Sequence, residues 1–142
     1  MLDFLQNFRG KAAATVGAAE MSGDPTRTFD AILRAAATEG ASDVHFEPKE
    51  DGLVVRFRLD GEMHGHLRLP VAQREALLAL GKIFGGMDIT EKRLPQDGRA
   101  VLRERGRRFH LRLSTLPTVH GESLVIRLLD QTMPSQDFAQ LG

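Results

Sequence analysis

The stretch LVVRFRLDGEMHGHLRL, residues 53–69, indicates the fold class. In its first half apolar residues alternate with polar ones, which places the apolar side chains on one face of a β-strand. The Asp60–Gly61 pair is typical of a tight hairpin turn, so the second half is expected to return as an antiparallel strand. In the returning strand, one face is predicted to carry Met63, Leu67 and Leu69, and the solvated face His64, His66 and Arg68.

Two helices and further strands are predicted around this hairpin. The first helix has Asp24 as its N-cap, Pro25 at its first position and Gly40 at its C-terminal stop. Together these elements predict an α+β fold with a mainly antiparallel sheet of about six strands and two main helices. The second helix is expected over 70–86, and the other strands over 43–48, 98–105, 107–116 and 122–130.

Bulk composition excludes several classes of protein. The 142 residues suit one compact domain, and 19 cations balance 19 anions, so no net charge attracts nucleic acid. The chain has no cysteine, Trp or Tyr, which excludes disulfides and weakens any base-stacking function. Its start lacks the uninterrupted apolar run of a signal peptide. These features favour a cytoplasmic protein with no nucleic-acid partner.

The stretch EKRLPQDGR, residues 91–99, is a rigid and highly charged bend. Pro95 and the Asp97–Gly98 pair predict a turn that determines where Arg99 points. Strand alternation places Arg112 on the face away from the core. A guanidinium binds phosphate oxygens through two parallel hydrogen bonds and keeps its charge at all relevant pH values. A phosphate-binding site and an ordinary solvated arginine face both fit these residues, and composition alone favours the solvated face.

Two kinds of site are not predicted. A P-loop is not expected because the sequence contains no GxxxxGK[ST] pattern, so the chain alone is not expected to hydrolyse ATP. A metal site is not expected either, because His64 and His66 have no further ligand at suitable spacing.

The order of several sequence motifs strongly resembles that of the secretion ATPases, the motors of type II secretion and type IV pilus assembly. The resemblance extends over residues 24–142. It is carried by GASDVHFEP (40–48), VVRFRLDGEM (54–63), MDITEKRLPQDGR (87–99) and LRLSTLPTVHGESLVIRLLD (111–130).

This resemblance implies a domain organisation. Residues 24–131 resemble the PAS-like α/β domain that precedes a RecA-like motor domain. Residues 132–142 resemble the linker toward that motor domain, which this chain does not contain, and residues 1–23 are expected to be an N-terminal linker or arm. The resemblance also implies a hexamer, with ATP and Mg²⁺ held by the motor domain. The implied partners are the motor domain, neighbouring subunits and a platform protein of the inner membrane, where peripheral attachment is an alternative to a purely cytoplasmic location.

The resemblance also implies roles for particular residues. Arg99 and Arg112 match the arginines that the family directs toward nucleotide phosphates, and Arg93 is a less well matched candidate. The domain would then be non-catalytic by itself, supplying arginines and coupling ATP hydrolysis to ring motion. One departure is His110, which stands where the family has an acidic residue near the strand arginine. The alternative is a standalone PAS-like module that binds a ligand or a protein.

Overall fold

The computed structural model describes residues 24–131, and the predicted terminal segments, 1–23 and 132–142, lie outside the described residues. The elements follow the predicted order of one helix, three strands, a second helix and three strands. Their bounds are α3 Pro25–Glu39, β1 Asp43–Lys49, β2 Gly52–Leu59, β3 Glu62–Pro70, α4 Val71–Phe84, β4 Gln96–Glu104, β5 Arg107–Thr118 and β6 Gly121–Asp130.

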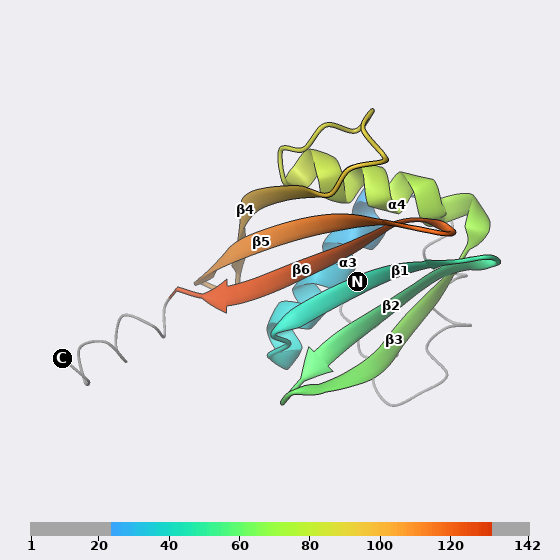
Figure 1. Cartoon of the computed structure of the whole chain (residues 1–142). Helices are drawn as coiled ribbons and strands as arrows, with labels where there is room; N and C mark the ends of the chain where they lie inside the picture. The colour runs from blue at the N-terminus through green and yellow to red at the C-terminus, as the bar shows by residue number, and fades with distance from the viewer. Residues whose placement is uncertain (1–23, 132–142) are drawn as a thin grey trace.

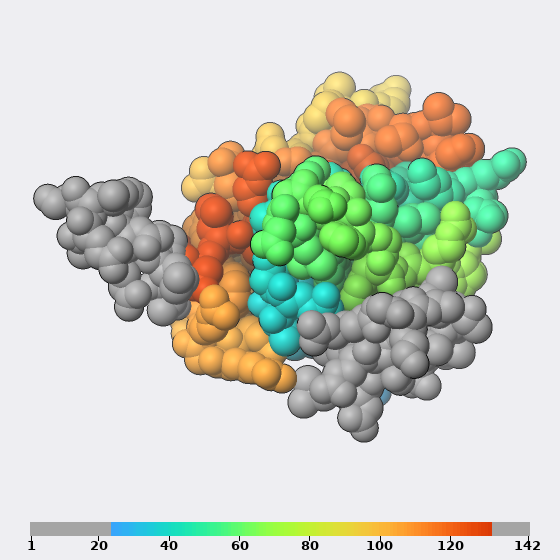
Figure 2. Space-filling model, turned by 90° about the horizontal axis from the view of Figure 1, so that it is seen from below, coloured from blue at the N-terminus to red at the C-terminus, as the bar shows by residue number. Residues whose placement is uncertain are grey.

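The strands form one six-stranded sheet in the order β3-β2-β1-β6-β5-β4, and every neighbouring pair is antiparallel. Figure 1 shows α3 and α4 behind the sheet, so one face of the sheet packs against helices. Seen from below, the green β2–β3 hairpin forms the near edge of the molecule (Figure 2). The predicted α+β architecture with an antiparallel sheet is therefore confirmed, while its PAS-like character stays a prediction.

Helix α3 begins and ends as its sequence predicts. The Asp24 carboxylate accepts a hydrogen bond from the Thr26 main-chain N–H at 3.0 Å, and Pro25 occupies the first turn. Gly40 ends the helix in the left-handed conformation, with φ of 77°. The apolar face buries Phe29, whose ring stacks on Phe46 of β1 at 5.7 Å between centroids. This contact fixes α3 against the middle of the sheet.

Helix α4 contains a glycine that close packing explains. A glycine inside a helix costs about 1 kcal/mol relative to alanine. A Cβ on Gly81 would lie 2.3 Å from the end of the Leu124 side chain of β6, so a larger residue here would require Leu124 to move. The helix begins later than predicted, because Pro70 is the last residue of β3 and the N-cap of α4.

The predicted solvent exposure of His66 is wrong. The Asp60–Gly61 turn forms as predicted, with positive φ at both residues. However, the register between β2 and β3 shifts between Val55 and Arg56, so β3 contains a bulge. The bulge turns His66 toward the core, where its ring stacks on Phe57 at 4.0 Å. Burial lowers the pKa of His66 from 6.5 to about 4.

The face of the sheet away from the helices carries the polar side chains. Along β5, Leu111 and Leu113 are buried while Arg112 and Ser114 are exposed, as the alternation predicts. Neither α3 nor α4, the two helices within residues 24–131, is long and apolar enough to cross a membrane. The exposed sheet face is where the predicted arginines must lie.

Candidate functional site

Arg99 and Arg112 are direct neighbours on the exposed face of the sheet. Arg99 lies in β4 and Arg112 in β5, and their Cα atoms are paired in the antiparallel register. Both residues are exposed. Strand pairing therefore brings together two arginines that are 13 positions apart in the sequence. The sequence predicted both residues but not that they face each other.

The register continues this row of charges across the sheet. Arg112 is paired with Arg127 of β6, Arg127 with Asp43 of β1, and Asp43 with Arg58 of β2. The nearly buried Asp43 carboxylate lies 3.2 Å from Arg127 Nε and 3.4 Å from Arg58 Nε. One carboxylate thus forms ion pairs with two arginines. We call Arg127, Asp43 and Arg58 the charge triad.

The other two arginines of the row have no such neutralisation. Within residues 24–131, the side chains of Arg99 and Arg112 form no hydrogen bond and no ion pair. Like charges directly opposite each other on neighbouring strands are destabilising. His110 lies on the same face, where its Nδ1 atom is 3.2 Å from Gln131 Nε2. As a histidine it cannot provide the carboxylate that would neutralise Arg112. We call Arg99 and Arg112 the arginine pair.

A small hollow of about 190 Å³ lies beside the arginine pair. One wall contains Asp97, whose carboxylate accepts a hydrogen bond from the Ser114 hydroxyl at 2.9 Å and forms no ion pair with Arg99 or Arg112. Two unneutralised guanidiniums at a hollow form an arrangement that an oxyanion such as a phosphate group can occupy. The lining residues are Asp97, Gly98, Arg99, Arg112, Leu113 and Ser114.

The predicted turn at Asp97–Gly98 is wrong, because both residues lie inside β4. Gly98 is needed for a different reason. A Cβ at this position would lie 2.2 Å from the Gly85 carbonyl oxygen, at the end of α4. The next main-chain N–H, that of Arg99, donates to the same carbonyl at 3.3 Å. Close approach to the end of α4, rather than a turn, holds the backbone of Arg99.

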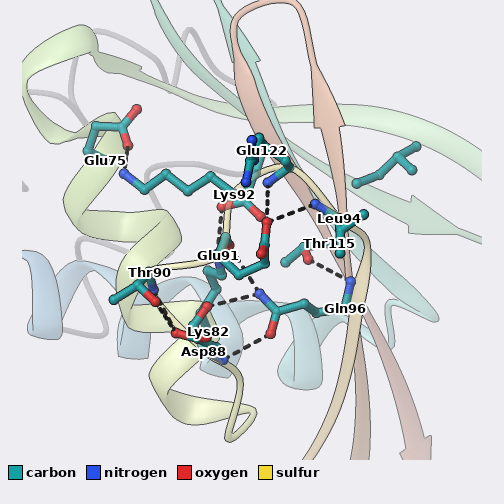
Figure 3. A network of polar contacts seen from close by, with 12 residues as sticks. Glu75, Lys82, Asp88, Thr90, Glu91, Lys92, Leu94, Gln96, Thr115 and Glu122 are labelled. Carbon is teal, nitrogen blue, oxygen red and sulfur yellow. Dashed lines mark hydrogen bonds and ion pairs between the residues drawn. The ribbon is translucent and has the colours of Figure 1, made fainter.

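The bend between α4 and β4 is ordered by its own side chains (Figure 3). Gln96, which sequence reasoning missed, accepts from the Asp88 N–H at 2.9 Å and donates to the Asp88 carbonyl at 2.9 Å. Its amide also donates to the Glu91 carbonyl at 3.2 Å. Gln96 is the first residue of β4, so its side chain connects the bend to that strand. Its position directly before Asp97-Gly98-Arg99 was the only signal in the sequence.

Acidic side chains cap the turns of the same bend. Asp88 accepts from the hydroxyl and the N–H of Thr90, and these hydrogen bonds lower the pKa of Asp88. The Glu91 carboxylate accepts from the N–H of Arg93 at 2.8 Å. Arg93 is exposed in this bend and does not line the hollow. The arrangement brings Arg99 and Arg112 together and leaves Arg93 apart from the hollow's lining.

Two other features bear on alternative sites. No group of three His, Asp or Glu residues within 24–131 is arranged to hold a metal ion. A wider groove of about 650 Å³ lies between α3, α4 and β4, with Phe29, Leu80, Ile83 and Val101 among its lining residues. This groove is the feature on which a ligand- or protein-binding module would depend.

Several known proteins are similar to this chain. It is 43% identical to the type II secretion system protein HxcR of Pseudomonas aeruginosa, covering 86% of this chain and 31% of that protein. It is 44% identical to the type IV pilus assembly ATPase PilB of Thermus thermophilus, covering 78% of this chain and 12% of PilB. The type IV pilus assembly ATPase TfpB of Acinetobacter baylyi is 46% identical, over 82% of this chain and 20% of TfpB.

The matched part of these relatives is small, since the alignments span between 12% and 31% of their lengths. The family model for type II/IV secretion system proteins matches residues 19–142, which is most of this chain. The chain therefore belongs to the type II/IV secretion system protein family.

Proposed function

We propose that this domain supplies Arg99 and Arg112 to the phosphates of ATP bound on a RecA-like motor domain of a hexameric secretion or pilus-assembly ATPase. By itself the domain is non-catalytic, and it couples ATP hydrolysis to motion of the ring. The observation that carries this proposal is the arginine pair, two neighbouring guanidiniums without a carboxylate partner in residues 24–131.

The chemistry follows from the charge that develops during phosphoryl transfer. Negative charge spreads over the oxygens of the transferred group, and an arginine placed beside them typically raises the rate about 10³- to 10⁵-fold. ATP and Mg²⁺ would be held by the motor domain, with this domain adding the guanidiniums from outside. An arginine already paired with a carboxylate, such as Arg127, is less suited to this role because its charge is neutralised.

The remaining partners follow from the same assignment. A domain that reaches a nucleotide on a motor domain must pack against that domain or against its neighbour in the ring. A platform protein at the inner membrane is the proposed recipient of the motion. The relatives HxcR, PilB and TfpB bear names from secretion and pilus assembly, and either system fits the proposal.

The test uses a chimera, in which residues 24–131 replace the matching region of the pilus ATPase TfpB, which is 46% identical over 117 residues. Arg99→Ala and Arg112→Ala should each lower ATP turnover roughly 10³-fold, by loss of a transition-state contact. Arg→Lys should restore little, because an ammonium cannot form two parallel hydrogen bonds. In urea unfolding of the chain, each alanine change should alter the free energy by less than about 0.5 kcal/mol.

Arg105→Ala is the matched control. Arg105 is an exposed arginine of the β4–β5 hairpin with only a 3.6 Å contact to Glu104. Its loss should leave turnover within twofold. If Arg99→Ala and Arg112→Ala behave like Arg105→Ala, the arginine pair is only a solvated face and the proposed function is wrong.

A further inference from the structure

Lys82 and Glu122 form an ion pair inside the protein, beside the bend between α4 and β4. Lys82 lies in the last turns of α4 and Glu122 near the start of β6, and their side chains are 3% and 7% exposed. Lys82 Nζ is 2.7 Å from Glu122 Oε1. Taking two charges out of water costs several kcal/mol per ion, and apolar residues of similar volume are often as stable. A buried pair therefore invites the question of what else it does.

The pair is not built for stability alone. The second carboxylate oxygen, Glu122 Oε2, is buried and has no hydrogen-bond partner in the described part of the chain. Buried polar atoms are nearly always hydrogen-bonded, since an unsatisfied one is destabilising. The unsatisfied Oε2 atom destabilises the fold, while the Oε1 atom of the same carboxylate holds the Lys82 ammonium in one place.

The held ammonium reaches the charged bend. Lys82 Nζ donates a hydrogen bond to the main-chain carbonyl of Glu91, and Gln96 Nε2 donates to the same carbonyl. Figure 3 shows these donors converging on the bend, with Lys82 coming from α4 and Gln96 from the start of β4. One carbonyl oxygen thus joins the helix, the bend and the strand that carries Arg99.

The end of α4 also holds both ends of the bend. The Lys82 carbonyl accepts from the Met87 N–H at 2.8 Å, and the Gly85 carbonyl accepts from the Arg99 N–H at 3.3 Å. Between these points, the Glu91 carbonyl is the anchor to Lys82 in the middle of the bend. A displaced Glu91 carbonyl would move Gln96, and Gln96 is three residues from Arg99.

We propose that Lys82 and Glu122 are positioning residues for Arg99: the buried pair fixes the bend through the Glu91 carbonyl and thereby sets the direction of the Arg99 guanidinium. This inference rests on the proposed function, because it assigns the pair a role in phosphate contact rather than in folding alone. Both side chains are buried, so their effect on turnover is expected to pass through Arg99.

The decisive variant replaces the pair without leaving a charge, as Lys82→Met with Glu122→Leu. Such a replacement is often neutral or stabilising. The urea midpoint of the chain should therefore stay the same or rise. The Glu91 carbonyl nevertheless loses its ammonium donor, so the bend is held less tightly.

In the TfpB chimera this pair variant should lower kcat roughly 10- to 100-fold, since a displacement of about 1 Å can cost 10²-fold in rate. KM for ATP should stay within twofold, because the contact is made in the transition state. In an Arg99→Ala background the same replacement should have no further effect, as expected for residues that act through one group. Lys92→Met is the matched control, because Lys92 lies in the same bend but is 64% exposed, and it should leave kcat within twofold.

The outcomes separate the two proposals. Unchanged turnover in Arg99→Ala would refute the proposed function, whatever the pair variant does. If Arg99→Ala lowers turnover while the pair variant is as active as wild type, or the two effects multiply, the positioning inference is wrong and the proposed function stands. If the pair variant does not fold, Lys82→Gln with Glu122→Gln, which also removes both charges, takes its place in the same cycle: lack of additivity with Arg99→Ala supports the inference, and additivity or no effect overturns it.

Discussion

The arginine pair and the charge triad belong to one row of the same sheet, yet they are stabilised in different ways. In the charge triad, the nearly buried Asp43 carboxylate neutralises Arg127 and Arg58 at 3.2 and 3.4 Å. In the arginine pair, no carboxylate within residues 24–131 contacts either guanidinium. The difference shows that the cross-strand neighbour determines whether an arginine of this row is ion-paired.

The two regions also differ in what holds their backbone. Close packing holds the strand of the arginine pair, where Gly98 meets the Gly85 carbonyl and the bend is anchored from inside the protein. Surface ion pairs strengthen the strands of the charge triad. Packing beneath the sheet holds this strand without any ion pair from the two guanidiniums, so groups other than the arginine pair stabilise it.

The largest effect on the free energy of unfolding is expected from Gly98→Ala, which changes only the region of the arginine pair. The new methyl group would lie 2.2 Å from a main-chain oxygen that cannot rotate away. Overpacking against backbone should lower the free energy of unfolding by about 3 kcal/mol, measured by urea denaturation.

Gly65→Ala is the matched control, because nothing lies within 4 Å of a Cβ there. It should change stability by less than about 0.5 kcal/mol. Equal stability of the two alanine variants would show that close packing does not hold the strand of Arg99.

Acid should weaken the part of the sheet that contains β2 and β3. Burial lowers the pKa of His66 to about 4, so the unfolded chain binds the proton first as the pH falls. The stabilisation is complete above pH 6.5 and is lost between about pH 6.5 and 4. At about 1.4 kcal/mol per pKa unit, a pKa lowered from 6.5 to about 4 corresponds to a loss of roughly 3 kcal/mol.

Urea denaturation at several pH values checks this prediction. His66→Gln should flatten the slope between pH 6.5 and 4, while His64→Gln, at an exposed position, should keep it. Some slope should remain in His66→Gln, because burial also lowers the pKa of His45. An unchanged slope in His66→Gln would contradict the burial of its ring against Phe57.

The smallest of these effects on the free energy of unfolding is expected from Asp43→Asn, which changes only the charge triad. Hydrogen bonds to charged groups contribute about 1.5 to 3 kcal/mol, and the exposure of both arginines reduces that value. The free energy of unfolding should therefore fall by about 2 kcal/mol. Asp51→Asn, whose carboxylate is 78% exposed, should have almost no effect. Equal stability of both variants would mean that the charge triad and the arginine pair do not differ.

The elements were predictable because their signals are local. Caps such as Asp24 and Gly40 and the alternation along β2 and β5 depend on neighbouring residues alone. His66 was misplaced because a bulge depends on the register with the partner strand, which alternation does not reveal. The same limit applies to Gly98, whose neighbour Gly85 is close only in the folded chain.

The site was predictable only in part. Arg99 and Arg112 followed from the resemblance to secretion ATPases, and the exposure of Arg112 followed from strand alternation, whereas the turn expected to direct Arg99 is absent. Their pairing across β4 and β5, and the absence of a nearby carboxylate, required the register. Lys82 and Glu122 gave no signal, because a lysine in an amphipathic helix and a glutamate after a glycine are both typical of solvated surfaces.

The hydrogen bond from the Arg99 N–H to Gly85 also has a consequence for aggregation. Strand β4 is an edge of the sheet, and exposed edges are templates on which a strand of another molecule can be added. The contact with Gly85 removes one donor from that edge, and the bulge in β3 disrupts the opposite edge. Both ends of this open sheet thus resist intermolecular strand addition, which favours solubility of a domain that must keep an exposed polar face.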